Sequence, residues 1–138
     1  VEGQSADIDS KKKSISVSVL KKIHSWKTAA LLKACVRGSA LICDASSAKI
    51  AALVDYAEHL GLAFQIADDI LDVTATRATL GKPVKADIGK GFPHLIGLER
   101  SKVLAEEEKN RAVLALNKFG GQAVWLRKIA DYVVARNK

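Results

Sequence analysis

Three aspartates interrupt one of the most apolar parts of the chain, the segment AFQIADDILDV at residues 63–73. On a helix Asp68 and Asp72 share a face, and Asp69 and Asp72 are also neighbours, so the spacing predicts that the three carboxylates converge. Burying them unpaired beside apolar side chains would be costly. A divalent cation would remove the conflict, because Mg²⁺ binds one or two carboxylates and leaves its other positions to water and phosphate.

Two other interpretations of these aspartates have to be weighed. They could simply lie on the solvent-facing side of an amphipathic helix, and the aspartates alone do not decide between this and a metal site. An EF-hand is excluded, because the ligands at alternate positions and the central glycine of that loop are missing. The choice therefore depends on the residues nearby.

Lysines near the aspartates in sequence are suited to bind phosphate. Lys82, Lys85 and Lys90 lie in a loop rich in glycine and proline, and Lys27 is followed by Thr28 in the upstream segment HSWKT. Lysine binds phosphate as a point charge. Carboxylates, a metal and lysines together predict a site for a diphosphate. Without the aspartates, an ordinary basic loop would be the preferred interpretation of Lys82 and Lys90.

The elements that must position these residues are all predicted to be helices. Apolar residues recur at intervals of three and four in two long segments, about 18–43 and 48–73. Gly61 lies inside the second, where it costs up to about 1 kcal/mol relative to alanine, so we expect it to permit a close helix–helix approach. The expected buried positions are Leu20, Ile23, Ala30, Leu31, Ala34, Gly38, Leu41 and Ile42 in the first helix, and Leu53, Tyr56, Leu60, Phe64, Ala67 and Leu71 in the second.

The rest of the chain is also predicted to be helical. Residues 74–93 form the one substantial loop, a third helix covers about 94–118, FGGQ interrupts it, and a last helix covers about 123–136. No strand-like alternation persists for more than a few residues. The predicted fold class is therefore all-α.

Composition limits the class of protein. The 138 residues, 49% hydrophobic and 27% charged, fit one soluble globular domain, and no apolar run is long enough for a membrane span. Cys35 and Cys43 lie about 12 Å apart on one predicted helix, beyond disulfide reach, so we expect a reducing, cytoplasmic location. The net charge of +7 fits either anionic partners or a solvated basic face. Trp26 and Trp125 are expected to be packing residues.

Three segments carry a resemblance to a known family. They are KTAALLKACVRGSAL (27–41), GLAFQIADDILDV (61–73) and LGKPVKADIGKGFPHLIGLERS (80–101). In order and spacing they closely resemble the C-terminal half of the trans-prenyl diphosphate synthases, nearest to the bacterial farnesyl diphosphate synthases or geranyltranstransferases. The resemblance runs from GQSADID (3–9) to IADYVVARNK (129–138), which makes it far more specific than the aspartates alone.

The resemblance implies a fold and a reaction. The family is a helical bundle of the isoprenoid synthase type, in which two aspartate-rich motifs face each other across an apolar cavity. Three Mg²⁺ ions bridge the motifs to the diphosphate of an allylic substrate. Loss of that diphosphate leaves an allylic cation, which isopentenyl diphosphate attacks before a proton is lost. Residues 1–138 would be the C-terminal half of one polyprenyl synthetase domain, and a homodimer is implied.

The resemblance also implies roles for particular residues. Asp68, Asp69 and Asp72, here called the aspartate motif, correspond to the second aspartate-rich motif and would bind Mg²⁺, with Asp68 as the strongest ligand. Lys27 corresponds to the lysine that contacts the allylic diphosphate. Thr28 would hold or polarise the reacting end of the substrate.

Further correspondences concern the substrates. Phe64 would line the pocket of the homoallylic substrate, and the amide of Gln65 would lie near the substrate. Lys82 corresponds to a diphosphate-binding lysine. Gln4 and Asp7 lie in a segment that borders the active site in the family.

The chain departs from the family pattern in two places. The loop DIGKGFP is shorter than usual between Asp87 and Lys90, so the role of Lys90 as a second diphosphate-binding lysine depends on its reach. The first aspartate-rich motif is absent, as are the residues that bind isopentenyl diphosphate. The chain begins with Val1, so we expect that it is a fragment whose N-terminal half is missing, and that it does not catalyse alone.

The sequence agrees with three possible functions to different degrees. The preferred one is the C-terminal half of a Mg²⁺-dependent prenyltransferase that makes a farnesyl-type diphosphate, with prenyl diphosphates and the missing half as partners. The second is a non-catalytic, prenyl-synthase-like subunit that modulates a complete synthase, which retention of the aspartates and lysines disfavours. The third, nucleic-acid binding, is disfavoured because an acidic cluster repels phosphate and no helix-turn-helix pattern is present.

Overall fold

The computed structural model describes residues 15–80 and 91–136, with side chains left undescribed at 75–80. The elements are α2 (Val17–His24), a π-helical turn η2 (Ser25–Ala29), α3 (Ala30–Ile42), α4 (Ser47–Leu80), α5 (Phe92–Ile96), α6 (Leu98–Ala115), a 3₁₀ segment η3 (Leu116–Ala123) and α7 (Val124–Ala135). Within these ranges there is no strand, which confirms the all-α prediction. No helix in the described part of the chain combines the length and apolarity that a membrane crossing requires.

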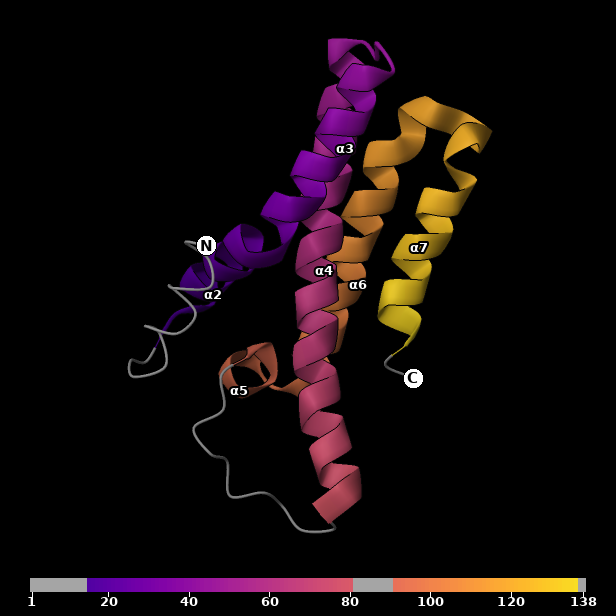
Figure 1. The fold of residues 1–138 in the computed structure, drawn as a ribbon. Coiled ribbons are helices and arrows are strands. Elements are labelled where there is room, and N and C mark those ends of the chain that lie inside the picture. Colours follow the sequence, from indigo (N-terminus) through magenta and orange to yellow (C-terminus); the bar gives the residue numbers. More distant parts are fainter. Residues whose placement is uncertain (1–14, 81–90, 137–138) are drawn as a thin grey trace.

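Helix α4 is the central element of the fold. Figure 1 shows α3 running along one side of it and α6 and α7 along another, while α2 and α5 lie beside its middle and lower parts. The aspartate motif lies on this central helix. Every other helix can therefore approach it.

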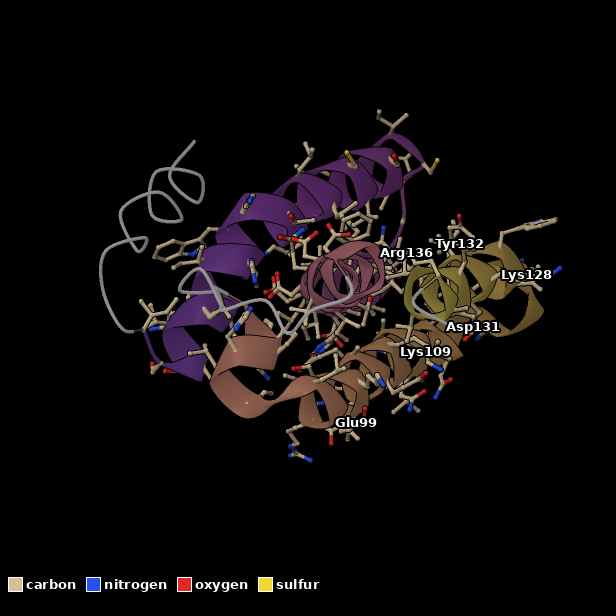
Figure 2. The ribbon with its side chains drawn as sticks, turned by 90° about the horizontal axis from the view of Figure 1, so that it is seen from below. Glu99, Lys109, Lys128, Asp131, Tyr132 and Arg136 are labelled. Carbon is tan, nitrogen blue, oxygen red and sulfur yellow. The ribbon has the colours of Figure 1, made fainter. Side chains whose placement is uncertain are left out.

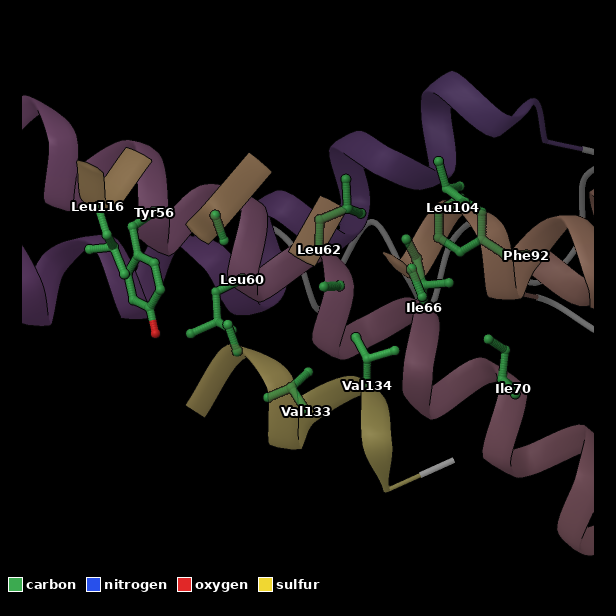
Figure 3. Close-up of a cluster of buried hydrophobic side chains, with 14 of the residues drawn as sticks. Tyr56, Leu60, Leu62, Ile66, Ile70, Phe92, Leu104, Leu116, Val133 and Val134 are labelled. Atoms are coloured by element: carbon green, nitrogen blue, oxygen red, sulfur yellow. The ribbon is translucent and has the colours of Figure 1, made fainter. Parts of the chain in front are cut away.

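The core forms where α4 meets α6, η3 and α7. Its largest members include Tyr56, Ile66 and Ile70 from α4 and Leu116 from the start of η3 (Figure 3). The Tyr56 hydroxyl donates a hydrogen bond of 2.9 Å to the carbonyl of Leu126, and burial raises the pKa of Tyr56 to about 12. The apolar residues of α4, which recur every three to four positions, thus lie on the side of the helix that faces the core.

Two predicted element boundaries were wrong. Helix α4 continues to Leu80, although the threonine-rich sequence after Val73 suggested a loop; the hydroxyl of Thr74 bonds back to the carbonyl of Ile70 at 3.0 Å, which lets threonine stay in a helix. The predicted helix over 94–118 is broken at Gly97, whose φ of 84° lies in the left-handed region. It therefore appears as the short α5 and the longer α6.

The first predicted helix contains a wider turn. The amide of Ala30 donates to the carbonyl of Ser25, five residues back, which defines η2 as π-helical. Each helical residue turns the chain by about 100°, so one extra residue moves later side chains to another face. Leu20 and Ile23, before η2, are buried as predicted, but several positions expected to be buried after it are exposed: Ala30, Leu31, Ala34, Leu41 and Ile42.

The tryptophans and cysteines lie at the surface. Trp26 is 54% exposed and Trp125 is 70% exposed, so neither packs in the core as expected; Trp125 instead contacts the Lys128 ammonium, which lies 4.7 Å from its ring centroid. Cys35 and Cys43 are both free and exposed, as their predicted separation requires.

Candidate functional site

The π-helical turn packs directly against α4 at Gly61. A Cβ atom at Gly61 would lie 2.7 Å from both the Cα and the Cβ of Ala29, which is far inside van der Waals contact. The predicted close approach is thus confirmed. Thr28, just before Ala29, is half-buried, and Lys27 is exposed.

The face of α4 that meets η2 continues into the aspartate motif. Gly61, Gln65, Asp68 and Asp72 are separated by four, three and four residues, so they share one face of the helix. Gly61 and Asp68 lie about 10 Å apart along the axis at 1.5 Å per residue. The structure therefore brings the Lys27 turn to the face that carries two of the three aspartates, with the buried amide of Gln65 between them.

Asp68 is paired with a cation from the end of α7. The Nη2 atom of Arg136 lies 2.5 Å from Asp68 Oδ1, and the same nitrogen donates to the carbonyl of Phe64 at 3.3 Å. The guanidinium also lies over the half-buried Phe64 ring, 4.2 Å from its centroid. Figure 2 shows Arg136 at the side of α7 that faces α4. Arg136 therefore joins the residues predicted for the site, although the sequence assigned it no role.

Asp69 points to different partners. Its Oδ2 atom accepts the Phe92 amide at 2.9 Å and lies 3.5 Å from His24 Nε2. These partners belong to α5 and α2, whereas the partner of Asp68 belongs to α7. The predicted convergence of all three carboxylates is thus not seen; within residues 15–80 and 91–136, no three acidic, histidine or cysteine side chains gather as a metal site would require.

The remaining aspartate fits a smaller metal site. Asp72 is exposed and lies one helical turn after Asp68 on the same face. Mg²⁺ typically takes one or two protein carboxylates and fills its octahedron with water and substrate phosphate. Asp68 and Asp72 would supply the two carboxylates of such a site. Arg136, which pairs with Asp68, would have to move away from Asp68 for a cation to bind there.

A second polar cluster fixes η2 and α3 against α4. Glu58 accepts a hydrogen bond from the Ser25 hydroxyl at 2.5 Å and pairs with Lys33. Burial alone would raise the pKa of Glu58, but the hydrogen bonds from Lys33 and Ser25 outweigh it, so the pKa of Glu58 lies below its ordinary value. The ionised carboxylate therefore holds the start of η2 and the first turn of α3 against α4.

A buried carboxylate joins three helices behind the site. Glu108 on α6 is 1% exposed and contacts Lys21 Nζ at 3.1 Å, His59 Nδ1 at 2.7 Å and Arg111 at 3.5 Å. A charge buried to this extent requires such partners. The cluster fixes α2 and α6 to α4.

Four predicted site residues, Gln4, Asp7, Lys82 and Lys90, lie outside the described residues. Conversely, the structure places two residues beside the aspartate motif that were not predicted from the sequence, His24 and Arg136. His24 stands three residues before Lys27 in the segment HSWKT, and this proximity in sequence indicates that it could lie near the site. Arg136 looked like an ordinary basic residue at a helix end.

The chain is similar to known proteins along almost its whole length. The family model described as polyprenyl synthetase matches residues 1–131. The farnesyl diphosphate synthase of Escherichia coli is 40% identical over 143 residues, which cover 99% of this chain and 48% of that protein. The solved FPP/GFPP synthase of Zymomonas mobilis is 30% identical with a TM-score of 0.79, covering 96% of this chain and 44% of the other.

A further solved structure is informative about ligands in a relative. The geranyltransferase of Helicobacter pylori, complexed with magnesium and isoprenyl diphosphate, is 25% identical with a TM-score of 0.73, covering 97% of this chain and 45% of that one. The chain thus spans about half the length of the relatives it matches. Sequence and fold agree, and the chain belongs to the polyprenyl synthetase family.

Proposed function

We propose that this chain forms part of a trans-prenyltransferase that condenses dimethylallyl or geranyl diphosphate with isopentenyl diphosphate to give a farnesyl-type product. The observation that carries the proposal is the contact of η2 with α4 at Gly61, which brings Lys27 and Thr28 to the face that bears Asp68 and Asp72. The similarity to farnesyl diphosphate synthases supports the same reaction.

Residues of this chain fit the requirements of a diphosphate leaving group. Asp68 and Asp72 would hold Mg²⁺, which when bound supplies positive charge to the departing diphosphate and orients it. The magnesium in the Helicobacter pylori relative supports this choice of cation. Lys27, on the exposed side of η2, would pair with the diphosphate from the other end of the face.

The neighbouring residues position the substrate and exclude water. Gln65, 8% exposed, offers an amide to the substrate between Lys27 and Asp68. The Phe64 ring would form an apolar wall for the isopentenyl group. A dry apolar surface is needed because an allylic cation is otherwise captured by water.

The experiment is a prenyl-transfer assay on the intact protein with Mg²⁺, isopentenyl diphosphate and geranyl diphosphate. We expect Asp68→Ala to lower turnover by about 10²–10³-fold with an unchanged far-ultraviolet circular dichroism spectrum, because charge stabilisation of the leaving group is lost. Asp131→Ala is the matched control, since Asp131 is an exposed aspartate of α7 whose carboxylate lies 3.7 Å from Lys109 of α6, away from the aspartate motif.

Other outcomes would point elsewhere. Normal turnover in Asp68→Ala would refute the metal role of Asp68. An inactive wild type that changes the rate of a complete synthase would support a modulating subunit instead. A native mass of twice the chain mass would support the proposed homodimer, and fractionation of cells would test the proposed cytoplasmic location.

A further inference from the structure

We propose that Asp69 is a positioning residue, which ties the α2–η2 junction and the start of α5 to α4, and that the cation is left to Asp68 and Asp72. The proposal deepens the proposed function and rests on it only for the cation. Adjacent helical residues point about 100° apart. Asp68 accordingly meets α7, whereas Asp69 meets α2 and α5.

The first contact of Asp69 closes the start of α5. The first amides of a helix have no partner within the helix, and Asp69 Oδ2 accepts the one on Phe92 at 2.9 Å. The Phe92 side chain is fully buried, so this amide cannot turn to solvent without exposing the ring. Loss of the acceptor would therefore leave a buried donor unpaired.

The backbone next to Phe92 is shaped around the same carboxylate. Gly91 has a φ of 147°, and a Cβ atom there would lie 2.9 Å from both Cγ and Oδ2 of Asp69. Only glycine leaves this space to the carboxylate. The fit indicates that the carboxylate of Asp69 is an integral part of this turn.

The second contact leads to η2. His24 is 5% exposed, and among the described residues neither of its ring nitrogens has a partner in hydrogen-bonding geometry. Its Nε2 lies 3.5 Å from Asp69 Oδ2, and its ring lies 5.6 Å from that of Phe92. His24 directly precedes η2, so Asp69 links the turn that carries Lys27 to the helix that carries Asp68.

Three variants of the intact protein separate positioning from metal binding. Asp69→Asn keeps a carbonyl oxygen for the Phe92 amide but removes the charge, Asp69→Ala removes both, and Asp68→Asn is the matched ligand control. Two readouts are measured: hydrogen exchange of the Phe92 amide, and calorimetric titration of Mn²⁺ in the presence of inorganic pyrophosphate.

The proposal predicts opposite patterns for the two positions. Asp69→Asn should keep the exchange rate of the Phe92 amide and the Mn²⁺ affinity within about threefold of wild type, whereas Asp69→Ala should speed that exchange by about tenfold. Asp68→Asn should weaken Mn²⁺ binding by at least about tenfold without changing the exchange. Should Asp69→Ala not fold, Gly91→Ala displaces the same carboxylate and should also speed the exchange.

Two results would overturn the proposal. Asp69→Asn could weaken Mn²⁺ binding as much as Asp68→Asn does, which would make Asp69 a metal ligand. Alternatively, Asp69→Ala or Gly91→Ala could leave the exchange of the Phe92 amide unchanged. A wild type that binds no Mn²⁺ with pyrophosphate would refute the proposed function, while the exchange measurements would still decide the role of Asp69.

Discussion

Replacing Gly61 by alanine tests how tightly η2 is fixed to α4. The new methyl group would lie 2.7 Å from the Cα and Cβ of Ala29 and 3.0 Å from its nitrogen. Carbon atoms in contact prefer about 3.5–4.0 Å, so the two helices must separate by about 1 Å. Two of the three opposing atoms belong to the backbone, so no side-chain rotation can relieve the clash.

The expected magnitude combines two opposing effects. Overpacking costs about 1–3 kcal/mol, whereas replacing a helical glycine by alanine gains about 1 kcal/mol. We expect Gly61→Ala to lower the free energy of unfolding by about 1 kcal/mol. Gly38→Ala is the control, since Gly38 lies inside α3 and a Cβ atom there meets nothing within 4 Å. It should stabilise the protein by about 0.5–1 kcal/mol.

Urea unfolding and prenyl transfer measure the two consequences. The unfolding free energies of the two variants should differ by about 2 kcal/mol in favour of Gly38→Ala. A shift of about 1 Å at Ala29 also displaces Lys27, so turnover in Gly61→Ala should fall by about 10²-fold. A Gly61→Ala protein that is as stable as Gly38→Ala would refute the close approach.

Further predictions concern single contacts. Tyr56→Phe should lower the free energy of unfolding by about 1 kcal/mol in urea, because a buried hydrogen bond to α7 is lost. Glu108→Gln should cost about 3 kcal/mol in the same assay, because the Lys21 ammonium loses its buried counter-charge. The more exposed Glu107→Gln is the control and should cost under about 0.5 kcal/mol. The pKa of Glu58 lies below its ordinary value of 4.5, so its carboxylate stabilises the fold fully above pH 4.5 and loses this contribution as the pH falls further. The difference in unfolding free energy between wild type and Glu58→Gln should therefore shrink as the pH is lowered below 4.5. An unchanged difference at low pH would contradict the ion pair with Lys33.

The central helix could be predicted because its apolar period is strong and uninterrupted. Tyr56, Leu60 and Ala67 were assigned to the core from spacing alone, and all three are buried. Its end could not be predicted, because threonine propensity favours a loop until a hydroxyl such as that of Thr74 finds a backbone acceptor. The bond from the Thr74 hydroxyl to the Ile70 carbonyl can be identified only from the structure.

The exposure of Leu31 and Ile42 shows a different limit. A helical period counted through η2 keeps its phase, whereas the real chain loses it at the π-helical turn. No residue type in SWKTA announces such a turn. The wrong burial predictions are the ones for residues after η2, because the phase of the helix changes only there.

The candidate site was predictable in its residue types but not in its contacts. Lys27, Asp68 and Asp72 were selected as candidates because charged residues in apolar helices need partners. Their neighbours come from distant segments: Arg136 lies 68 residues from Asp68 in sequence, and Phe92 lies 23 residues from Asp69. The packing of the helices decides which basic residue pairs with Asp68 and which backbone amide bonds to Asp69.

The π-helical turn also has a consequence for how this chain can change over evolution. An extra residue inside a helix corresponds to a single inserted codon, and deleting any codon of Ser25–Ala29 would restore regular winding. That deletion would rotate α2 by about 100° against α3 and carry Leu20 and Ile23 out of the core. Substitutions cannot produce this rotation. Even where a residue of the segment has no role in packing or in the proposed site, its replacement should therefore be tolerated better than its deletion.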